Sequence, residues 1–169
     1  MIKKSAVGQV QMSFGMIFSI ILIIVFLAFA FYAIKFFLGI QKNATAGKFI
    51  NDLQSDIDRI WISGTESVEE QEYFLPQKVS SICFVDFSFR EGRGPNANIF
   101  RELNFAVLDN ENMVFYPVGS SDIESAKIKK IDLGSITGSE NPYCIEGSKG
   151  KIRMTLSKNY GEALVKIAR

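Results

Sequence analysis

One uninterrupted apolar run near the start of the chain constrains its fold more than any other feature. Between Ser5 and Ile34, 30 consecutive residues include no Lys, Arg, Asp or Glu, and the part from Phe14 onward reads FGMIFSIILIIVFLAFAFYAI. These 21 residues would span about 32 Å as an α-helix, enough to cross a hydrocarbon core of about 30 Å. The alternative is a buried core helix, but the rest of the chain could hardly cover all of its faces. The sequence therefore predicts a transmembrane helix over residues 14–40, with the lipid bilayer around it.

The flanks of the run favour a retained anchor over a cleaved secretory signal. Lys3 and Lys4 precede it, as in a signal peptide, but the run exceeds the roughly 7–15 apolar residues of such a peptide. Tyr32 and Lys35 suit the membrane interface, where aromatic rings and long cationic side chains settle. Because lysines lie on both sides of the run, positive charge does not decide the orientation. The two cysteines, which suit an oxidising compartment, favour a short basic tail over 1–13 on the cytoplasmic side and a C-terminal domain outside the cell.

A second, amphipathic pattern follows and predicts a helical stalk over residues 41–63. Apolar residues recur there every three or four positions, and acids, beginning with Asp52, occupy other faces. One helix from about Phe14 to Ser63 is expected; two helices with a break near Gly39 or Gly47 are the alternative. The recurring apolar residues are Phe49, Ile50, Leu53, Ile57, Ile60 and Trp61.

Residues 64–169 have the pattern of a β-rich domain. Apolar and polar residues alternate, most clearly over 152–156, as in a half-buried strand. Asp109–Asn112 and Asn159–Glu162 are typical of hairpin turns. The fold class expected is α+β: a long N-terminal helix and a small, mostly antiparallel β domain packed against the Trp61 face. The expected strands are Glu72–Leu75, Val79–Phe89, Ile99–Leu108, Asn112–Tyr116, Lys127–Leu133, Lys151–Ser157 and Ala163–Ala168.

Composition narrows the chemistry that the chain can perform. It has no His, and its 19 Lys and Arg nearly balance its 18 Asp and Glu. Without His there is no imidazole-dependent catalytic pair and no His-based metal site, and the charge balance removes the usual argument for nucleic-acid binding. The sequence offers no catalytic, cofactor-binding or metal-ligating set. We therefore expect a protein that is not an enzyme, with no cofactor and no nucleic-acid partner.

Several polar segments could bind a ligand but have simpler interpretations. Arg90–Asn98 carries two arginines on a Gly-rich loop that could clasp an anion, although a solvated loop is the favoured interpretation. Gly134–Pro142 is expected to be a second connecting loop. An acidic run is expected to form a solvated loop surface. Its members are Glu66, Glu69, Glu70 and Glu72.

Two covalent modifications are predicted. Cys83 and Cys144 are the only cysteines, and in an external domain they would form one disulfide that closes a loop of about 60 residues. Two buried free thiols are the alternative. Asn43-Ala44-Thr45 is an acceptor sequence for N-glycosylation, which makes Asn43 a candidate site.

The residues before the apolar run and at its start form a pattern of their own. Lys3-Lys4-Ser5-Ala6-Val7-Gly8 is followed by Gln9, and Gln11-Met12-Ser13-Phe14 comes shortly after. The first stretch resembles the junction that a prepilin-type peptidase cleaves, and the second resembles the Gln-x-Ser core of a class III signal peptide. This N-terminus therefore resembles that of archaeal type IV pilin-like proteins. The resemblance implies cleavage between Gly8 and Gln9 and a structural or adhesive subunit of a surface filament or of its assembly machine. The family pattern has Glu two residues after that Ser, where this chain has Gly15. The core also lies two positions late relative to Gly8.

Two functional hypotheses follow. In the first, a pilin-like single-pass membrane protein associates with itself or with other pilin-like subunits through the Phe-rich face of its apolar helix. In the second, an uncleaved signal-anchor protein uses an external β domain to bind a partner or serves as an accessory envelope subunit; the missing Glu favours this hypothesis. The phenylalanines of the first are Phe14, Phe18, Phe26, Phe29 and Phe31.

Overall fold

A computed structural model describes residues 14–107 and 110–169, with the side chains of residues 39–43 and 106 left out. The chain divides into two compact units, Met1–Gly39 and Ile40–Arg169. Helix α1 (Phe14–Ile62) is 49 residues long, so it supplies the described part of the first unit and the first element of the second. The single continuous helix expected from the sequence is therefore present, and its last residues belong to the β-rich unit.

The second unit contains two antiparallel sheets, which we call the first and second sheets. The first sheet has the strand order β1-β6-β7, and the second has the order β4-β3-β2-β5. The first sheet consists of β1 (Ser67–Phe74), β6 (Lys151–Lys158) and β7 (Lys166–Ala168). The second consists of β4 (Ser125–Ala126), β3 (Met113–Tyr116), β2 (Ser81–Phe84) and β5 (Tyr143–Glu146).

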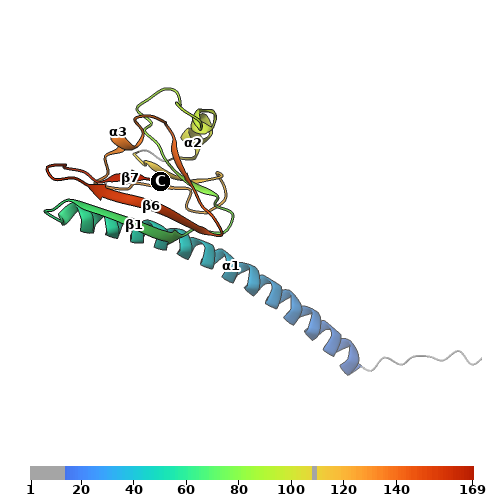
Figure 1. The fold of residues 1–169 in the computed structure, drawn as a ribbon. Coiled ribbons are helices and arrows are strands. Elements are labelled where there is room, and N and C mark those ends of the chain that lie inside the picture. Colours follow the sequence, from blue (N-terminus) through green and yellow to red (C-terminus); the bar gives the residue numbers. More distant parts are fainter. Residues whose placement is uncertain (1–13, 108–109) are drawn as a thin grey trace, which may run out of the picture. The chain divides into compact units, whose positions relative to one another are not determined.

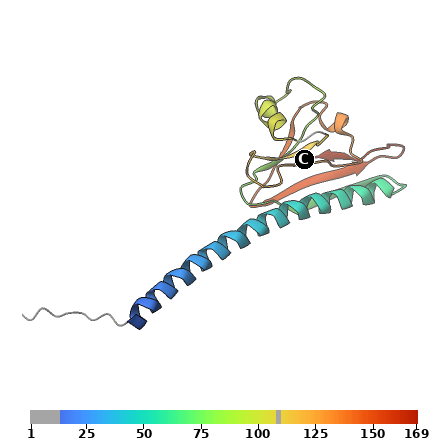
Figure 2. The ribbon, with the colours of Figure 1, turned by 180° about the vertical axis from the view of Figure 1, so that it is seen from behind.

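Short helices complete the second unit. They are the 3₁₀ helix η1 (Ala97–Ile99) and the α-helices α2 (Phe100–Ala106) and α3 (Leu133–Ile136). Within this unit the C-terminal half of α1 runs beside β1, as the two opposite views agree (Figures 1 and 2). The expected α+β class, a long apolar helix followed by a small antiparallel β domain, is confirmed at this level.

The amphipathic half of α1 forms one wall of the main core. Its buried side chains follow the three- and four-residue spacing seen in the sequence, and they pack with inward-facing residues of both sheets. Phe49 makes edge-on contacts with Tyr73 of β1 and Phe115 of β3, each with ring centroids 5.5 Å apart. The buried residues of α1 are Ala46, Phe49, Leu53, Ile57 and Ile60.

A second, smaller core lies on the other face of the second sheet. Phe100 and Leu103 of α2 are buried there with Val114 and both cysteines. The strand expected over Ile99–Leu108 is therefore wrong as far as the structure describes it, because Ala97–Ala106 forms η1 and α2. The three-residue spacing of Phe100 and Leu103 puts both on one side of a helix, where they cover the sheet.

Two other segments have a different secondary structure from the one that the sequence predicts. Lys127–Leu133 is not a strand: β4 ends at Ala126, Ile131 makes one isolated bridge to Val165, and α3 begins at Leu133. Because Asp132 accepts the N–H of Ser135 at 2.9 Å, it caps α3 at the point where the strand was expected to end. The acidic run is not a loop, since three of its four glutamates lie in β1.

Two further differences concern turns and missed strands. Strand β5 was not expected, and it follows the cis Asn141–Pro142 bond at the end of the predicted loop Gly134–Pro142, which also contains most of α3. Asp109–Asn112 does not join two strands, because α2 and not a strand precedes it. The turn at Asn159–Glu162 does join β6 and β7, as predicted.

Candidate functional site

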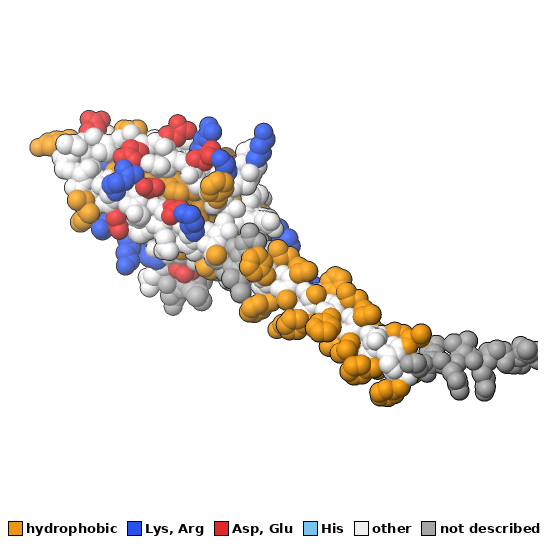
Figure 3. Space-filling model, turned by 90° about the horizontal axis from the view of Figure 1, so that it is seen from below, with side chains coloured by type: hydrophobic (Ala, Val, Ile, Leu, Met, Phe, Trp, Pro, Cys, Tyr) orange, Lys and Arg blue, Asp and Glu red, His pale blue; other side chains and the backbone are white. Residues whose placement is uncertain are grey.

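The apolar part of α1 is the first candidate functional region. Over Phe14–Leu38 the helix is long and apolar enough to cross a membrane, and none of its most apolar stretch is buried within the chain. Apolar side chains cover the visible face of this part, whereas charged side chains gather on the second unit (Figure 3). Ser19 donates its hydroxyl to the carbonyl of Gly15 at 2.8 Å, so its polar group is satisfied inside the helix.

The phenylalanines predicted to mediate subunit association are all exposed. Phe14 is 84% exposed, and Phe26, Phe29 and Phe31 are each 68% exposed. The described part of the chain therefore does not cover these four side chains.

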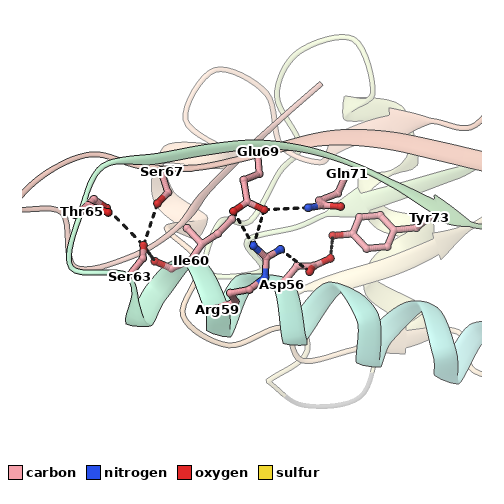
Figure 4. A network of polar contacts seen from close by, with 9 residues as sticks. All are labelled: Asp56, Arg59, Ile60, Ser63, Thr65, Ser67, Glu69, Gln71 and Tyr73. Carbon is pink, nitrogen blue, oxygen red and sulfur yellow. Dashed lines mark hydrogen bonds and ion pairs between the residues drawn. The ribbon is translucent and has the colours of Figure 1, made fainter.

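A polar network joins the second half of α1 to β1 (Figure 4). Arg59 donates to both carboxylate oxygens of Glu69 at 2.7 Å and to Asp56 at 2.8 Å, and the Tyr73 hydroxyl donates to Asp56 at 2.9 Å. Hydrogen bonds to Asp56 and then Glu69 raise the pKa of Arg59. Burial, followed by the hydrogen bond to Asp56, raises the pKa of Tyr73, so its hydroxyl stays a donor. The network fixes the helix under β1 and presents no group poised to react.

The end of α1 is fixed by side chains from elsewhere in the unit. Trp61 donates its indole N–H to the carbonyl of Ala163 at 2.9 Å, and the ammonium of Lys130 lies 3.9 Å from the centre of its ring. Lys158 donates to the carbonyl of Trp61 at 2.7 Å, which places a cation at the negative end of the helix dipole. The predicted packing of the Trp61 face is confirmed.

The predicted disulfide is present. Cys83 of β2 and Cys144 of β5 are directly opposite each other in the antiparallel ladder and are joined through their sulfur atoms, 61 residues apart in sequence. Both are buried in the smaller core.

The Arg90–Asn98 loop is used for internal contacts. The backbone of Arg93 pairs with Asn141 in both directions, and its guanidinium lies 4.4 Å from the centre of the Phe89 ring. Arg93 also donates to the carbonyl of Thr137 at 3.4 Å. This arginine therefore contributes to packing between loops, although it is exposed, as is Arg90.

A hollow of the second unit is lined by side chains of both charges. Its volume is about 1390 Å³, and Arg153, Lys151 and Arg169 face it together with Glu72, Glu140 and Glu146. Glu140 and Arg169 form an ion pair at 2.6 Å. Among the described residues, no three His, Cys, Asp or Glu side chains gather in a way that could hold a metal ion.

Some predicted site residues are not tested. Gly8 and Gln9, the predicted cleavage pair, lie outside the described residues. Asn43 falls within α1, where the structure gives the backbone and leaves out the side chain.

Sequence reasoning missed two buried asparagines that organise loops. Asn112 bonds both backbone polar groups of Ile128, and Asn141 does the same for Asp86. No local signal marks them, because each depends on which loop the fold brings alongside.

Comparison with protein-family models, with curated proteins and with solved structures found no match to this chain.

Proposed function

We propose that this chain is a pilin-like single-pass membrane protein that serves as a structural or adhesive subunit of a surface filament or of its assembly machine. The supporting observation is helix α1, which is apolar and unburied over Phe14–Leu38 and then forms a wall of the β-rich core. This layout suits a subunit that places one helix among lipids or neighbouring helices and carries a compact domain. The N-terminal resemblance points to the same function. In this proposal the second unit lies outside the cell, where its disulfide is stable.

The decisive experiment measures the intact mass of the protein extracted without reductant from its native membrane. Processing by a prepilin-type peptidase predicts a chain that begins at Gln9, with a mass two protons below that of the reduced form. Gly8→Leu should block this cleavage and leave the precursor. Gly64→Leu is the matched control, because a Cβ atom added there has no atom within 4 Å apart from its chain neighbours and the site is far from Gly8 in the sequence. A full-length mass for the unaltered protein would overturn the pilin proposal.

An uncleaved signal-anchor protein is the second candidate. It is favoured by Gly15, which stands where the family pattern has Glu, and by the position of the first acid, Asp52. An acidic side chain buried in lipid is stable only when it is paired with an opposite charge. Because this chain lacks the Glu of the family pattern, it lacks one interaction that could fix the register between neighbouring helices. A full-length mass together with an oxidised cysteine pair would support this candidate.

A further inference from the structure

Among the described residues of the second unit, β1 has the longest strand edge without a neighbouring strand. The strand has eight residues and lies at the end of the first sheet, next to β6. The backbone bond from Leu75 N–H to the Gly150 carbonyl, at 2.9 Å, fixes which residues of β1 face β6. Because hydrogen-bonded pairs alternate in an antiparallel ladder, the odd-numbered residues of β1 bond to β6. The backbone groups of Val68, Glu70, Glu72 and Phe74 therefore point away from the sheet.

A second contact supports this alternation. Lys151 stands opposite Phe74, yet both its N–H and its carbonyl bond to Ser148, at 3.0 and 2.7 Å. Phe74 therefore has no ladder bonds to Lys151. Within the described ranges 14–107 and 110–169, the backbone hydrogen bonds that lie outside the regular ladders also leave these four even-numbered residues unused.

The other sheet edges are short or covered. Strand β4 has two residues. At the β7 edge, Val165 bonds to Lys130 and Asp132, and at the β5 edge the carbonyl of Cys144 accepts from Arg169 at 3.0 Å. An uncovered edge strand is a template for another strand, which makes β1 the place where an extended chain can be added.

The side chains along this edge indicate which chain would fit. In Figure 4, Ser67, Glu69, Gln71 and Tyr73 point toward α1, so the alternate side chains occupy the opposite, solvent-facing side. That side presents an apolar, acidic, acidic, apolar series, and Val68 and Phe74 at its two ends are 63% and 65% exposed. Within the sheet, Lys151 and Arg153 of β6 pair with Glu72 at 2.6 and 3.0 Å, so basic side chains fit beside this acid.

A second copy of β1 is a poor occupant. Antiparallel pairing of two β1 strands centred on Gln71 would put Glu70 of one opposite Glu72 of the other, and like charges directly opposite destabilise a sheet. The acidic series therefore discourages self-pairing and favours a basic strand.

We propose that the edge of β1 binds an extended peptide segment that carries two basic side chains, flanked by apolar ones, at alternate positions. The segment adds a strand to the first sheet through the outward backbone groups of residues 68–74. Specificity comes from basic side chains opposite Glu70 and Glu72. This interaction does not depend on how the N-terminus is processed.

The test uses the full chain in uncharged detergent micelles and a fluorescent peptide, Val-Thr-Lys-Thr-Lys-Thr-Val. Its side-chain order is the same in both directions, so it fits a parallel or an antiparallel addition. Glu70→Lys should weaken binding of this peptide about tenfold and should strengthen binding of Val-Thr-Glu-Thr-Glu-Thr-Val. Glu102→Lys makes the same charge change at an exposed position of α2 and should alter neither affinity. Equal effects of the two substitutions, or no binding of the basic peptide, would overturn the proposal.

Backbone recognition is tested separately. Glu70→Thr and Glu70→Pro both remove the charge, but only proline removes the outward N–H, and the ladder to β6 does not use that N–H. The proline variant should therefore bind the basic peptide more weakly than the threonine variant. Hydrogen exchange gives a readout without substitution: the bound peptide should slow exchange at Glu70 and Glu72. Protection confined to another part of the chain would contradict strand addition at β1.

Discussion

At the scale of single residues, asparagine side chains stabilise loops of the second unit by forming hydrogen bonds to loop backbone groups, as a neighbouring strand would. Asn112 is 4% exposed and Ile128 is 1% exposed. The Asn112 side chain accepts the N–H of Ile128 at 2.8 Å and donates to its carbonyl at 2.9 Å. These backbone groups are buried, so the amide side chain takes the part of a strand partner.

Asn112→Ala should lower the free energy of unfolding by about 3 kcal/mol, because it leaves two buried backbone groups without partners. Asn104→Ala, on the exposed side of α2, should change it by less than about 0.5 kcal/mol. Denaturant unfolding of the full chain in micelles, followed by the fluorescence of Trp61, measures both. Equal losses from the two substitutions would show that the Asn112 clamp does not stabilise the unit.

Glu162 gives the turn between β6 and β7 a dependence on pH. Pairing with Lys166, followed by hydrogen bonds from Asn159, lowers the pKa of Glu162 from 4.5 to about 2. Because the folded state favours the ionised form, its stabilisation is present above pH 4.5 and is lost as the pH falls toward about 2. Glu162→Gln should therefore show a shallower loss of stability between these values. The pKa of Glu72 is also lowered, but Glu72 is present in both the unaltered protein and the Glu162→Gln variant. Its contribution to the pH dependence is therefore the same in both and does not affect the comparison. Parallel stability curves would contradict this role of Glu162.

At the scale of elements, α1 changes its surroundings along its length. Leu53 is fully buried against the sheets, whereas Ile62, on the last turn, is 72% exposed. Leu53→Ala should destabilise the second unit by about 3 kcal/mol through the lost contacts and the cavity that remains. Ile62→Ala should cost less than about 0.5 kcal/mol. Unfolding followed by Trp61 fluorescence separates them, and a small effect at Leu53 would mean that α1 is not part of this core.

The elements that the sequence predicts well are those with a long, regular pattern. The apolar run and the three- and four-residue spacing after it predict α1, and strict alternation predicts β6. The segment around Phe100 was misassigned because a seven-residue helix gives few repeats, and its two buried residues also fit a short strand. Strand β1 was only partly predicted, because glutamates are uncommon in strands and the pairing of Glu72 with Arg153 depends on a distant segment.

The candidate sites can likewise be divided into those that depend on a local pattern and those that depend on contacts between distant segments. The segment that is long and apolar enough to cross a membrane could be predicted from the sequence alone, because its length and its apolar composition are both local properties. The free edge of β1 could not, because strand order decides which edge remains unpaired. The disulfide was predictable in identity, since the chain has two cysteines, but its place between β2 and β5 depends on a strand that the sequence did not reveal.

At the scale of the whole molecule, the two units depend on different surroundings for their stability. In the first, apolar side chains of α1 are exposed and its backbone is bonded within the helix, which suits a micelle or a bilayer. The second has its own core and a disulfide.

Heating the full chain in micelles should therefore unfold the second unit cooperatively, as reported by Trp61 fluorescence, while the circular dichroism spectrum retains the helical signal of about the first 25 residues of α1. The Leu53→Ala variant should lower the midpoint temperature of the Trp61 fluorescence transition and leave the helical signal that remains after it unaltered. Loss of all helical signal in one step, together with the Trp61 transition, would show that the apolar part of α1 is not independently stabilised by the apolar phase.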